Sequence, residues 1–432
     1  MKYYSTNHKS EKVSFKEAVL ESMAGDGGLY FPEKISAFSD SFFKKLPGMP
    51  LSEIGFHFLK PYVDGALPDT ELSDIMEDVF SFDIPLVEVE TDKYALELFH
   101  GPTLAFKDVG ARTLARLLSK FSITHKTTIL VATSGDTGSA VAHGFFDMPN
   151  VDVVVLYPKN KVSKLQEKQF TTLGKNITVL EVNGNFDDCQ RMVKAAFADE
   201  ELKNRIHLSS ANSINIARLL PQAIYYFYAY GQLKSRDKPV IISVPTGNLG
   251  NLTAGLLAKK SGLPVECFVA AANRNNVFQE YLETGIFRPR ASVSTLSNAM
   301  DVGNPSNLVR IQELYDHSLE AVWKDISPYH FSDEETRRAI ADVYNRTQYI
   351  LDPHGAVAYL GLSSYTKEKN VTGIFLETAH PAKFYQTVEQ EIPVKVEIPK
   401  RLANSLNRPK QTVEIGREPE DLKSFLLEQW PV

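Results

Sequence analysis

The sequence predicts an α/β fold with open, mostly parallel sheets, preceded by a separate mixed α/β module. From Thr91 onward, apolar runs of strand length alternate with segments of helical periodicity, which is the pattern of repeated β-α units. Residues 151–157 are apolar at almost every position, as in a strand buried on both faces of a parallel sheet. Ligands of such sheets bind beyond the carboxyl ends of the strands, so we expect the functional residues there.

The individual elements follow from local signals. A capping box at residues 14–17 predicts the start of an amphipathic helix, and residues 25–32 predict a turn followed by a short extended segment. Further helices are expected at 51–59, 70–80, 109–121, 138–146, 165–170, 186–197, 214–230, 252–259 and 354–363. Strands are expected at 94–99, 127–132, 151–157, 177–182, 240–244, 265–270 and 371–377. Residues 271–330 predict loops with short helices, and the polar chain after Pro399 predicts a peripheral tail.

Composition narrows the class of protein. A length of 432 residues suggests two or three domains, and 43% hydrophobic with 23% charged residues is ordinary for a soluble protein. The formal net charge of −6 argues against nucleic-acid binding as the main task, although a local group of cations can still hold an anionic substrate. The two cysteines lie in no C-x-x-C pattern, which predicts neither a metal site nor a disulfide framework. The polar N-terminus and the absence of a long apolar run predict a cytoplasmic protein without a membrane partner.

The first chemical signal is the stretch H-G-P-T-L-A-F-K-D at residues 100–108, which follows a predicted strand and precedes a predicted helix. A lysine held near apolar surface has a lowered pKa, because desolvation disfavours its charged form. Its neutral amine is then a nucleophile that forms Schiff bases with carbonyl groups. Taken alone, Lys107 is better explained as a solvated lysine in a first helical turn, because most lysines are exposed.

Two glycine-containing loops form the second signal. The stretches A-T-S-G-D-T-G-S-A at 132–140 and V-P-T-G-N-L-G-N at 244–251 each join a predicted strand to a predicted helix. Backbone N–H groups at such junctions bind anions. An ordinary capped junction explains the first loop about equally well. The second loop has neither the lysine of a Walker A loop nor a G-x-G-x-x-G pattern, so it suits a single phosphate.

A third group lies in S-S-A-N-S-I-N-I-A-R at 209–218. Asn212, Ser213 and Asn215 precede a predicted helix, and Arg218 lies one turn inside it. Two interpretations are equally consistent with these residues. One is a capped helix with an arginine on its surface, and the other is a second phosphate site in which the arginine binds in bidentate fashion. At a strand end, F-L-E-T-A-H-P-A-K-F occupies residues 375–384.

In this order, the K-D, S-G-D-T-G, T-G-N-x-G and T-A-H-P-A-K-F blocks resemble the pyridoxal-phosphate (PLP) enzymes of the tryptophan-synthase-β type, also called fold type II. Within them the sequence is most similar to the threonine synthases. The resemblance implies two PLP-enzyme domains after the N-terminal module. Residues 1–92 would form that module, 93–130 with 213–400 a large PLP-binding domain, 131–212 a small substrate-closing domain, and 401–432 a C-terminal tail.

The resemblance also implies the cofactor and its ligands. Pyridoxal 5′-phosphate would be bound to Lys107, the catalytic residue, and no metal is implied. The phosphate of PLP would lie at Thr246, Gly247, Asn248, Leu249 and Gly250, and its pyridine nitrogen at Thr378. Asp136 stands where many relatives have an asparagine that hydrogen-bonds the 3′-oxygen of PLP. Since a carboxylate cannot donate a hydrogen bond, the role of Asp136 stays open. His380 and Lys383 would either support the site or help bind phosphate.

The implied substrate is O-phospho-L-homoserine, and the implied products are L-threonine and phosphate, formed by β,γ-elimination and replacement. The carboxylate of this substrate would lie at Thr133, Ser134, Gly135 and Thr137. Its phosphate would lie at Asn212, Ser213, Asn215 and Arg218. We expect a monomer or homodimer that acts on this small molecule, with no nucleic-acid partner.

Three alternatives remain at this stage. A related PLP lyase would eliminate phosphate and release a keto acid while sharing every cofactor motif. A threonine or serine dehydratase is disfavoured, because it needs no second phosphate site around Arg218. A phosphate- or nucleotide-binding regulatory protein would be colourless after purification and would not depend on Lys107.

Overall fold

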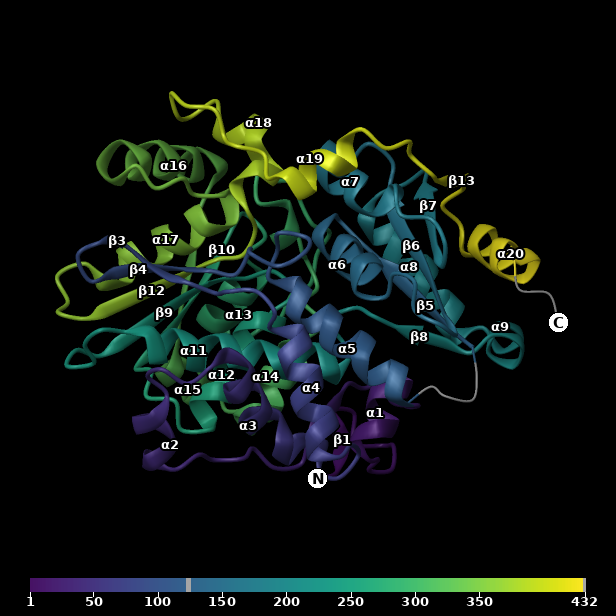
Figure 1. Cartoon of the computed structure of the whole chain (residues 1–432), viewed down its shortest axis with the longest axis horizontal. Coiled ribbons are helices and arrows are strands. Elements are labelled where there is room, and N and C mark those ends of the chain that lie inside the picture. The colour runs from purple at the N-terminus through teal and green to yellow at the C-terminus, as the bar shows by residue number, and fades with distance from the viewer. Residues whose placement is uncertain (122–125, 430–432) are drawn as a thin grey trace.

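The computed structural model describes residues 1–121 and 126–429 and has the predicted α/β fold. Residues 122–125 of the predicted large domain and 430–432 of the predicted tail lie outside the described residues. Two mostly parallel sheets lie on either side of α5 (Lys107–Phe121), and the N-terminal helices lie together along one edge of the molecule (Figure 1). None of the described helices has the length and apolar character to cross a bilayer.

The larger sheet has six strands in the order β11-β10-β9-β12-β4-β3, and only the β3–β4 pair is antiparallel. In that order the strands are Ile326–His330, Cys267–Ala272, Val240–Pro245, Thr372–Glu377, Lys93–Glu97 and Leu86–Glu90. Parallel pairing brings the carboxyl ends of β9, β12 and β4 to one edge of the sheet. The segments that carry Thr246, Thr378 and Lys107 begin at this edge.

The second sheet has five parallel strands in the order β13-β7-β6-β5-β8. These strands are Val413–Ile415, Ile177–Val182, Val151–Pro158, Thr127–Ala132 and Leu208–Ser210. The loop with Thr133 follows β5, and Asn212 follows β8, so both lie at the carboxyl edge of this sheet. The segment after Pro399, expected to be a peripheral tail, supplies the edge strand β13, and α20 (Pro419–Gln429) packs on α8 (Phe186–Ala198).

With one exception, the helices expected from periodicity are present. They are α1 (Phe15–Glu21), α3 (Leu51–Val63), α4 (Asp69–Val79), α5, α6 (Asp136–Gly144), α7 (Lys164–Thr171), α8, α12 (Gly250–Lys260) and α17 (Pro353–Thr366). The expectation of one helix over 214–230 was wrong. The structure has α10 (Ile216–Leu219), a 3-10 turn (Leu220–Gln222) and α11 (Ala223–Gln232), because Pro221 lacks the N–H that a continuous helix needs.

The remaining elements were expected only in outline or not at all. The short helices expected within 271–330 are α13 (Val277–Thr284), α14 (Leu308–Leu314), α15 (Leu319–Asp325) and a 3-10 turn (Asn298–Met300). The edge strand β11 in this region was not expected, and its central proline is tolerated because the strand lies at the sheet edge. The remaining elements are α2 (Asp40–Lys45), α9 (Glu200–Arg205), α16 (Asp333–Thr347), a 3-10 turn (Pro381–Phe384), α18 (Tyr385–Val388) and α19 (Lys400–Leu406).

The N-terminal module is built on a short antiparallel pair, β1 (Tyr3–Ser5) and β2 (Tyr30–Pro32). The capping box is confirmed, since the Ser14 hydroxyl accepts from the Glu17 amide and the Glu17 carboxylate accepts from the Ser14 amide. The 25–28 segment is the plain turn that the sequence favoured. The amides of Asp26, Gly27 and Gly28 already donate to the Ser10 hydroxyl, the Ala24 carbonyl and the Asp26 carboxylate, so they are not available to a phosphate.

The predicted domain boundaries stay a prediction, but the strand order suggests how to adjust them. Strand β3 lies within predicted module residues 1–92 and pairs with the six-stranded sheet. Strand β5 begins before residue 131 and lies wholly in the five-stranded sheet, as does β13 after residue 400. We therefore propose that the large domain begins near residue 85 and that the small one spans residues 127–212 together with the C-terminal strand and helix.

Close packing between α12 and β10 generates a prediction about stability. A Cβ atom at Gly255 would lie 2.6 Å from a ring carbon of Phe268 and 2.9 Å from one of Tyr226, and both rings are fully buried. We expect Gly255→Ala to lower the free energy of unfolding by about 1–3 kcal/mol, because overpacking forces the rings to shift. The measurement is denaturant unfolding. Gly25→Ala is the matched control, since its added methyl would meet nothing closer than 4.0 Å; equal stability of the two variants would contradict the expectation.

Candidate active site

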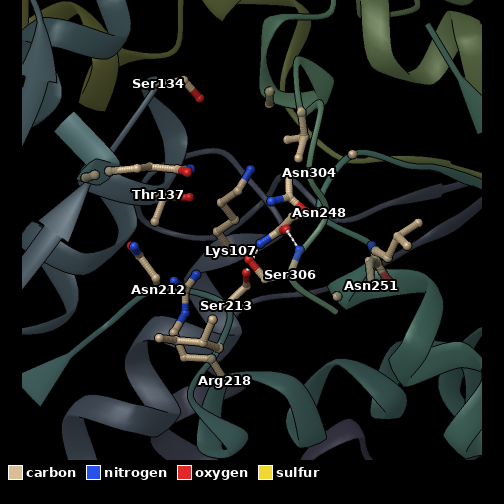
Figure 2. A pocket seen from close by; sticks show the side chains of 18 of the residues that line it. Lys107, Ser134, Thr137, Asn212, Ser213, Arg218, Asn248, Asn251, Asn304 and Ser306 are labelled. Carbon is tan, nitrogen blue, oxygen red and sulfur yellow. Dashed lines mark hydrogen bonds between the residues drawn. The ribbon is translucent and has the colours of Figure 1, made fainter. Parts of the chain in front are cut away.

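The carboxyl edges of the two sheets enclose a cavity of about 440 Å³. Figure 2 shows Lys107 at its centre, with Ser134 and Thr137 on one side, Asn248 and Asn251 on the other, and Arg218 below. The cavity brings together every residue predicted to bind cofactor or substrate except Gly135 and Asn215, and neither His380 nor Lys383 lines it. Among the described residues, no group of three or more His, Cys, Asp and Glu side chains could hold a metal ion.

Lys107 is the first residue of α5, and its side chain borders the cavity. The loop before it is fixed on both sides, since Phe106 donates its amide to the Thr378 carbonyl (2.9 Å) and accepts from the Tyr225 hydroxyl (2.6 Å). The pKa of Lys107 is lowered to about 8, chiefly because burial disfavours the charged amine; the carboxylate of Asp136 opposes this shift, and the positive charges of Lys383 and Arg218 add to it. A large share of Lys107 amines is therefore neutral at mildly alkaline pH.

Asp136 begins α6 and forms a buried ion pair with Lys383, with 2.6 Å between Oδ1 and Nζ. Burial raises the pKa of Asp136, but the ammonium groups of Lys383 and Lys107 and the amide of Gln166 outweigh it and hold this pKa well below its usual range. Asp136 is therefore ionised and accepts hydrogen bonds. Lys383 does not line the cavity, and it also donates to the Thr103 carbonyl (2.8 Å), so it supports Asp136 and binds no ligand directly.

In the loop between β5 and α6, some polar groups hold the turn in shape and others are available to bind a ligand. The Thr133 hydroxyl accepts from the amides of Gly135 (2.9 Å) and Gly138 (2.7 Å) and thereby shapes the turn. Gly135 has φ +140°, a conformation that favours glycine, and it does not line the cavity. The hydroxyls of Ser134 and Thr137 make no hydrogen bond within the described part of the chain and lie at the cavity wall (Figure 2).

Arg218 projects from α10 into the cavity wall and is 3% exposed. Helix α10 packs tightly on α5, since a Cβ atom at Gly110 would lie 2.9 Å from the Arg218 carbonyl oxygen, and this contact places Arg218 beside Lys107. Its Nη1 donates to the Ala211 carbonyl, while its Nε and the Oδ1 of Asn212 are buried without a partner in the described structure. Burial lowers the pKa of Arg218 to about 10, and it forms no ion pair with a described acidic residue. The Arg218 Nε–H is thus a buried donor that an anion can satisfy, whereas the Asn212 oxygen, an acceptor, requires a donor.

Asn215, predicted to bind substrate, has a different task. Its side-chain amide donates to the Val19 carbonyl (2.9 Å) and the Ser22 hydroxyl (2.8 Å), and its oxygen accepts from the Ala217 amide (3.0 Å). Asn215 therefore caps α10 and joins it to the N-terminal module, and it does not reach the cavity. The prediction failed because the same residue type serves a helix cap and an anion site equally well.

The loop before α12 offers unused donors. The amides of Gly247, Asn248 and Leu249 make no hydrogen bond in the described structure, and they lie at the N-terminus of this helix. The Asn248 side chain joins two neighbouring loops, donating to the Ser213 hydroxyl and accepting from the Ser306 amide, both at 2.5 Å (Figure 2). Gly247 is packed so closely that an added Cβ would lie 2.8 Å from the Met300 Cα.

Several residues of the cavity wall were not predicted from the sequence or were given no role there. Residues 297–307 form one wall of the cavity, and His354 holds it by accepting from the Ala299 amide (3.2 Å). The other ring nitrogen of His354 lies 2.5 Å from Asp352, which fixes the tautomer that accepts from Ala299. The N-terminal module also reaches the cavity, through Thr6, Asn7, Met23, Gly27, Gly28 and Leu29. No motif marks these contacts, because they arise only when distant segments pack together.

Comparison with known proteins identifies the family. Residues 85–376 match a model described as pyridoxal-phosphate dependent enzyme, residues 2–80 one described as threonine synthase N terminus, and residues 355–426 one described as threonine synthase, C-terminal. The chain is 45% identical to the threonine synthase of Haemophilus influenzae over 99% of this chain and all of that protein. It is 43% identical to that of Escherichia coli K12 over 95% of each.

Solved structures agree. The crystal structure of threonine synthase from Escherichia coli matches with a TM-score of 0.93 and 41% identity, covering 99% of this chain and 100% of that one. The PLP-bound threonine synthase from Brucella melitensis matches with a TM-score of 0.92 and 33% identity, with both chains fully covered. The order of the motifs, the cavity between two parallel sheets and these matches over the whole chain lead to one conclusion: the chain belongs to the threonine synthase family of PLP-dependent fold-type II enzymes.

Proposed function

We propose that this chain converts O-phospho-L-homoserine and water to L-threonine and phosphate, and that Lys107 is its catalytic residue. The observation that carries the proposal is that one cavity holds a lysine of lowered pKa between two separate sets of unsatisfied anion-binding groups. One set is the free amides before α12, and the other is centred on the unpaired Nε–H of Arg218. A substrate that carries its own phosphate needs the second set in addition to the one for the cofactor.

The residues present fit pyridoxal phosphate, the cofactor of this family. The three free amides at 247–249 and the helix N-terminus behind them suit its phosphate. Lys107 suits its aldehyde, and Thr378 follows β12 at the cavity wall, where a neutral hydroxyl suits the ring nitrogen. Bound there, the cofactor supplies an electron sink for the loss of protons next to its site of attachment. Ionised Asp136 lies at the same wall, so any contact it makes with the cofactor is as an acceptor.

The substrate would be held at both ends. Ser134 and Thr137 offer free hydroxyls to its carboxylate, while Arg218, Asn212 and Ser213 bind its phosphate. This orientation leaves Cα and Cβ of the substrate between the two ends, beside Lys107. The Lys107 amine, once released from the cofactor, would take the proton from Cα and must give that proton up before it takes the proton from Cβ, after which phosphate leaves from Cγ. Cγ then gains a proton, water adds its hydroxyl group at Cβ, and Cα regains a proton. Arg218 stabilises the charge on the departing phosphate.

Water must reach Cβ only after the phosphate has left. Strands β5 and β8 carry the carboxylate and phosphate loops on the five-stranded sheet, so a movement of this sheet toward the six-stranded one would enclose the substrate. We retain from the sequence the expectation of a cytoplasmic monomer or homodimer. Light scattering of the purified protein tests the oligomeric state.

The decisive experiment is a product assay on purified protein with O-phospho-L-homoserine. Phosphate and L-threonine in equal amounts support the proposal. Phosphate with a keto acid would instead assign the chain to the elimination-only lyases, and no phosphate release from protein that carries PLP would exclude this substrate.

We predict that Arg218→Met raises the KM for O-phospho-L-homoserine by about 10- to 100-fold, because a charge-assisted hydrogen bond to the phosphate is lost. The absorbance of bound PLP should stay unchanged, since Arg218 is not among the cofactor ligands. Steady-state kinetics and a visible spectrum measure both effects. Arg116→Met is the control, because Arg116 is a partly exposed residue of α5 that pairs with Asp78 away from the cavity. Loss of PLP from R218M would contradict the assignment of the two phosphate sites.

The pKa of Lys107 generates a second prediction. Because this pKa is lowered to about 8 and only the neutral amine reacts, the rate of labelling by an amine-specific reagent should rise with pH, reach half its maximum near pH 8 and then level off. Peptide mass spectrometry of cofactor-free protein measures this rate. The exposed Lys367 in the same sample is the control. Parallel pH profiles for the two lysines would show that the cavity does not lower the pKa of Lys107.

A further inference from the structure

Arg310 on α14 is a buried charge that the proposed reaction leaves unused. Its side chain is completely buried, and it does not line the cavity. Burial alone lowers its pKa to about 9, and it forms no ion pair with an acidic side chain in the part of the chain that the structure describes. Burying a cation without a counter-ion is unfavourable, so its retention calls for a reason beyond packing.

The guanidinium is held entirely by neutral oxygen atoms from three segments. It donates to the carbonyl of Tyr30 in the N-terminal module (2.9 and 3.2 Å). It donates to the carbonyls of Ser213 (3.3 Å) and Ile214 (2.6 Å), directly behind the predicted phosphate loop. It also donates to Oδ1 of Asn307 (2.8 Å).

Asn307 extends this contact toward the cofactor loop. Its side-chain amide donates to the Asn248 carbonyl (3.0 Å), and the Asn248 side chain donates to the Ser213 hydroxyl (2.5 Å). Arg310 therefore fixes Ser213 from behind, while Asn248 contacts the same residue from the cavity side. Ser213 is the point at which the two predicted phosphate sites meet.

We propose that Arg310 is a positioning residue for the substrate phosphate, holding the Ser213–Ile214 backbone in place and adding a second, uncompensated positive charge behind it. This inference rests on the proposed function. Arg218 faces the phosphate from within the cavity, and Arg310 acts on it through one layer of backbone. Its contact with Tyr30 also gives the N-terminal module a part in the site, since the module supplies an oxygen atom that holds this charge.

Substitutions at position 310 can separate the effect of the positive charge from the effect of the hydrogen bonds. If the charge matters, a lysine at position 310 should preserve much of the affinity for phosphate although it cannot reproduce the planar set of donors. If Arg310 only ties three backbones together, lysine should perform little better than an uncharged side chain. Its effect should also be specific to the phosphate end, because the hydroxyls of Ser134 and Thr137 lie on the other side of Lys107 (Figure 2).

The test measures binding of inorganic phosphate to the PLP-loaded protein by calorimetry, so that the cofactor fills its own phosphate site. We expect Arg310→Met to weaken phosphate binding about tenfold or more, because unlike charges attract strongly across a poorly polar wall. Arg310→Lys should stay within about threefold of the unaltered protein, on the same physical ground. PLP content and the spectral response to L-threonine, which carries no phosphate, should be the same in all variants.

Two controls keep the result interpretable. Arg112→Met removes a largely buried arginine that pairs with Asp78 outside the cavity, and it should leave phosphate binding unchanged. If R310M does not fold, Arg310→Gln, which keeps N–H donors but no charge, is compared with R310K. Phosphate binding by R310M within twofold of the unaltered protein overturns the proposal, as does equal weakening in the lysine and glutamine variants. These binding measurements need no turnover, whereas the product assay tests the proposed function independently.

Discussion

The ion pair between Lys383 and Asp136 connects the two sheets at the point where the chemistry takes place. Lys383 follows β12 of the six-stranded sheet, and Asp136 follows β5 of the five-stranded sheet. Both side chains are almost fully buried, so breaking the pair would leave an unpaired charge inside the protein, which is strongly destabilising. The Thr103 carbonyl, four residues before Lys107, accepts from Lys383 and from Gln169 of α7. The position of Lys107 relative to the 133–137 loop is thus set by polar contacts between the sheets.

Around this junction, positive charge lies both in the cavity wall and directly behind it. Arg218 and Arg310 have no acidic partner in the described structure, and the charge of Asp136 is taken up by Lys383. Bound anions neutralise this excess of positive charge, and a phosphorylated amino acid together with a phosphorylated cofactor supplies several negative charges. The electrostatic design of the wall therefore explains why the cavity suits two phosphates, a conclusion that the net charge of −6 for the whole chain conceals.

The sequence predicted what depends on local pattern. The strands at 127–132 and 177–182 have the expected bounds, and Lys107, Arg218 and the loop before α12 line one cavity as anticipated. Features that depend on packing between distant segments were not predictable. Asn215 looks like its neighbours Asn212 and Ser213, yet its amide is used by the N-terminal module. Arg310 lies in an unremarkable helical stretch, and its importance follows only from contacts with residues about 100 and 280 positions away.

The order of strands also has a consequence for synthesis on the ribosome. Strand β4 pairs with β12, and β7 pairs with β13, so each sheet is complete only after a strand far along the chain has been synthesised. A nascent chain that has reached residue 400 still presents the unpaired edge of β7, and open edges of this kind recruit strands from other chains. Strand β13 has only three residues, and it closes this edge when synthesis is almost complete. A messenger truncated just before Val413 would therefore encode every residue that lines the cavity and yet yield a chain inclined to aggregate.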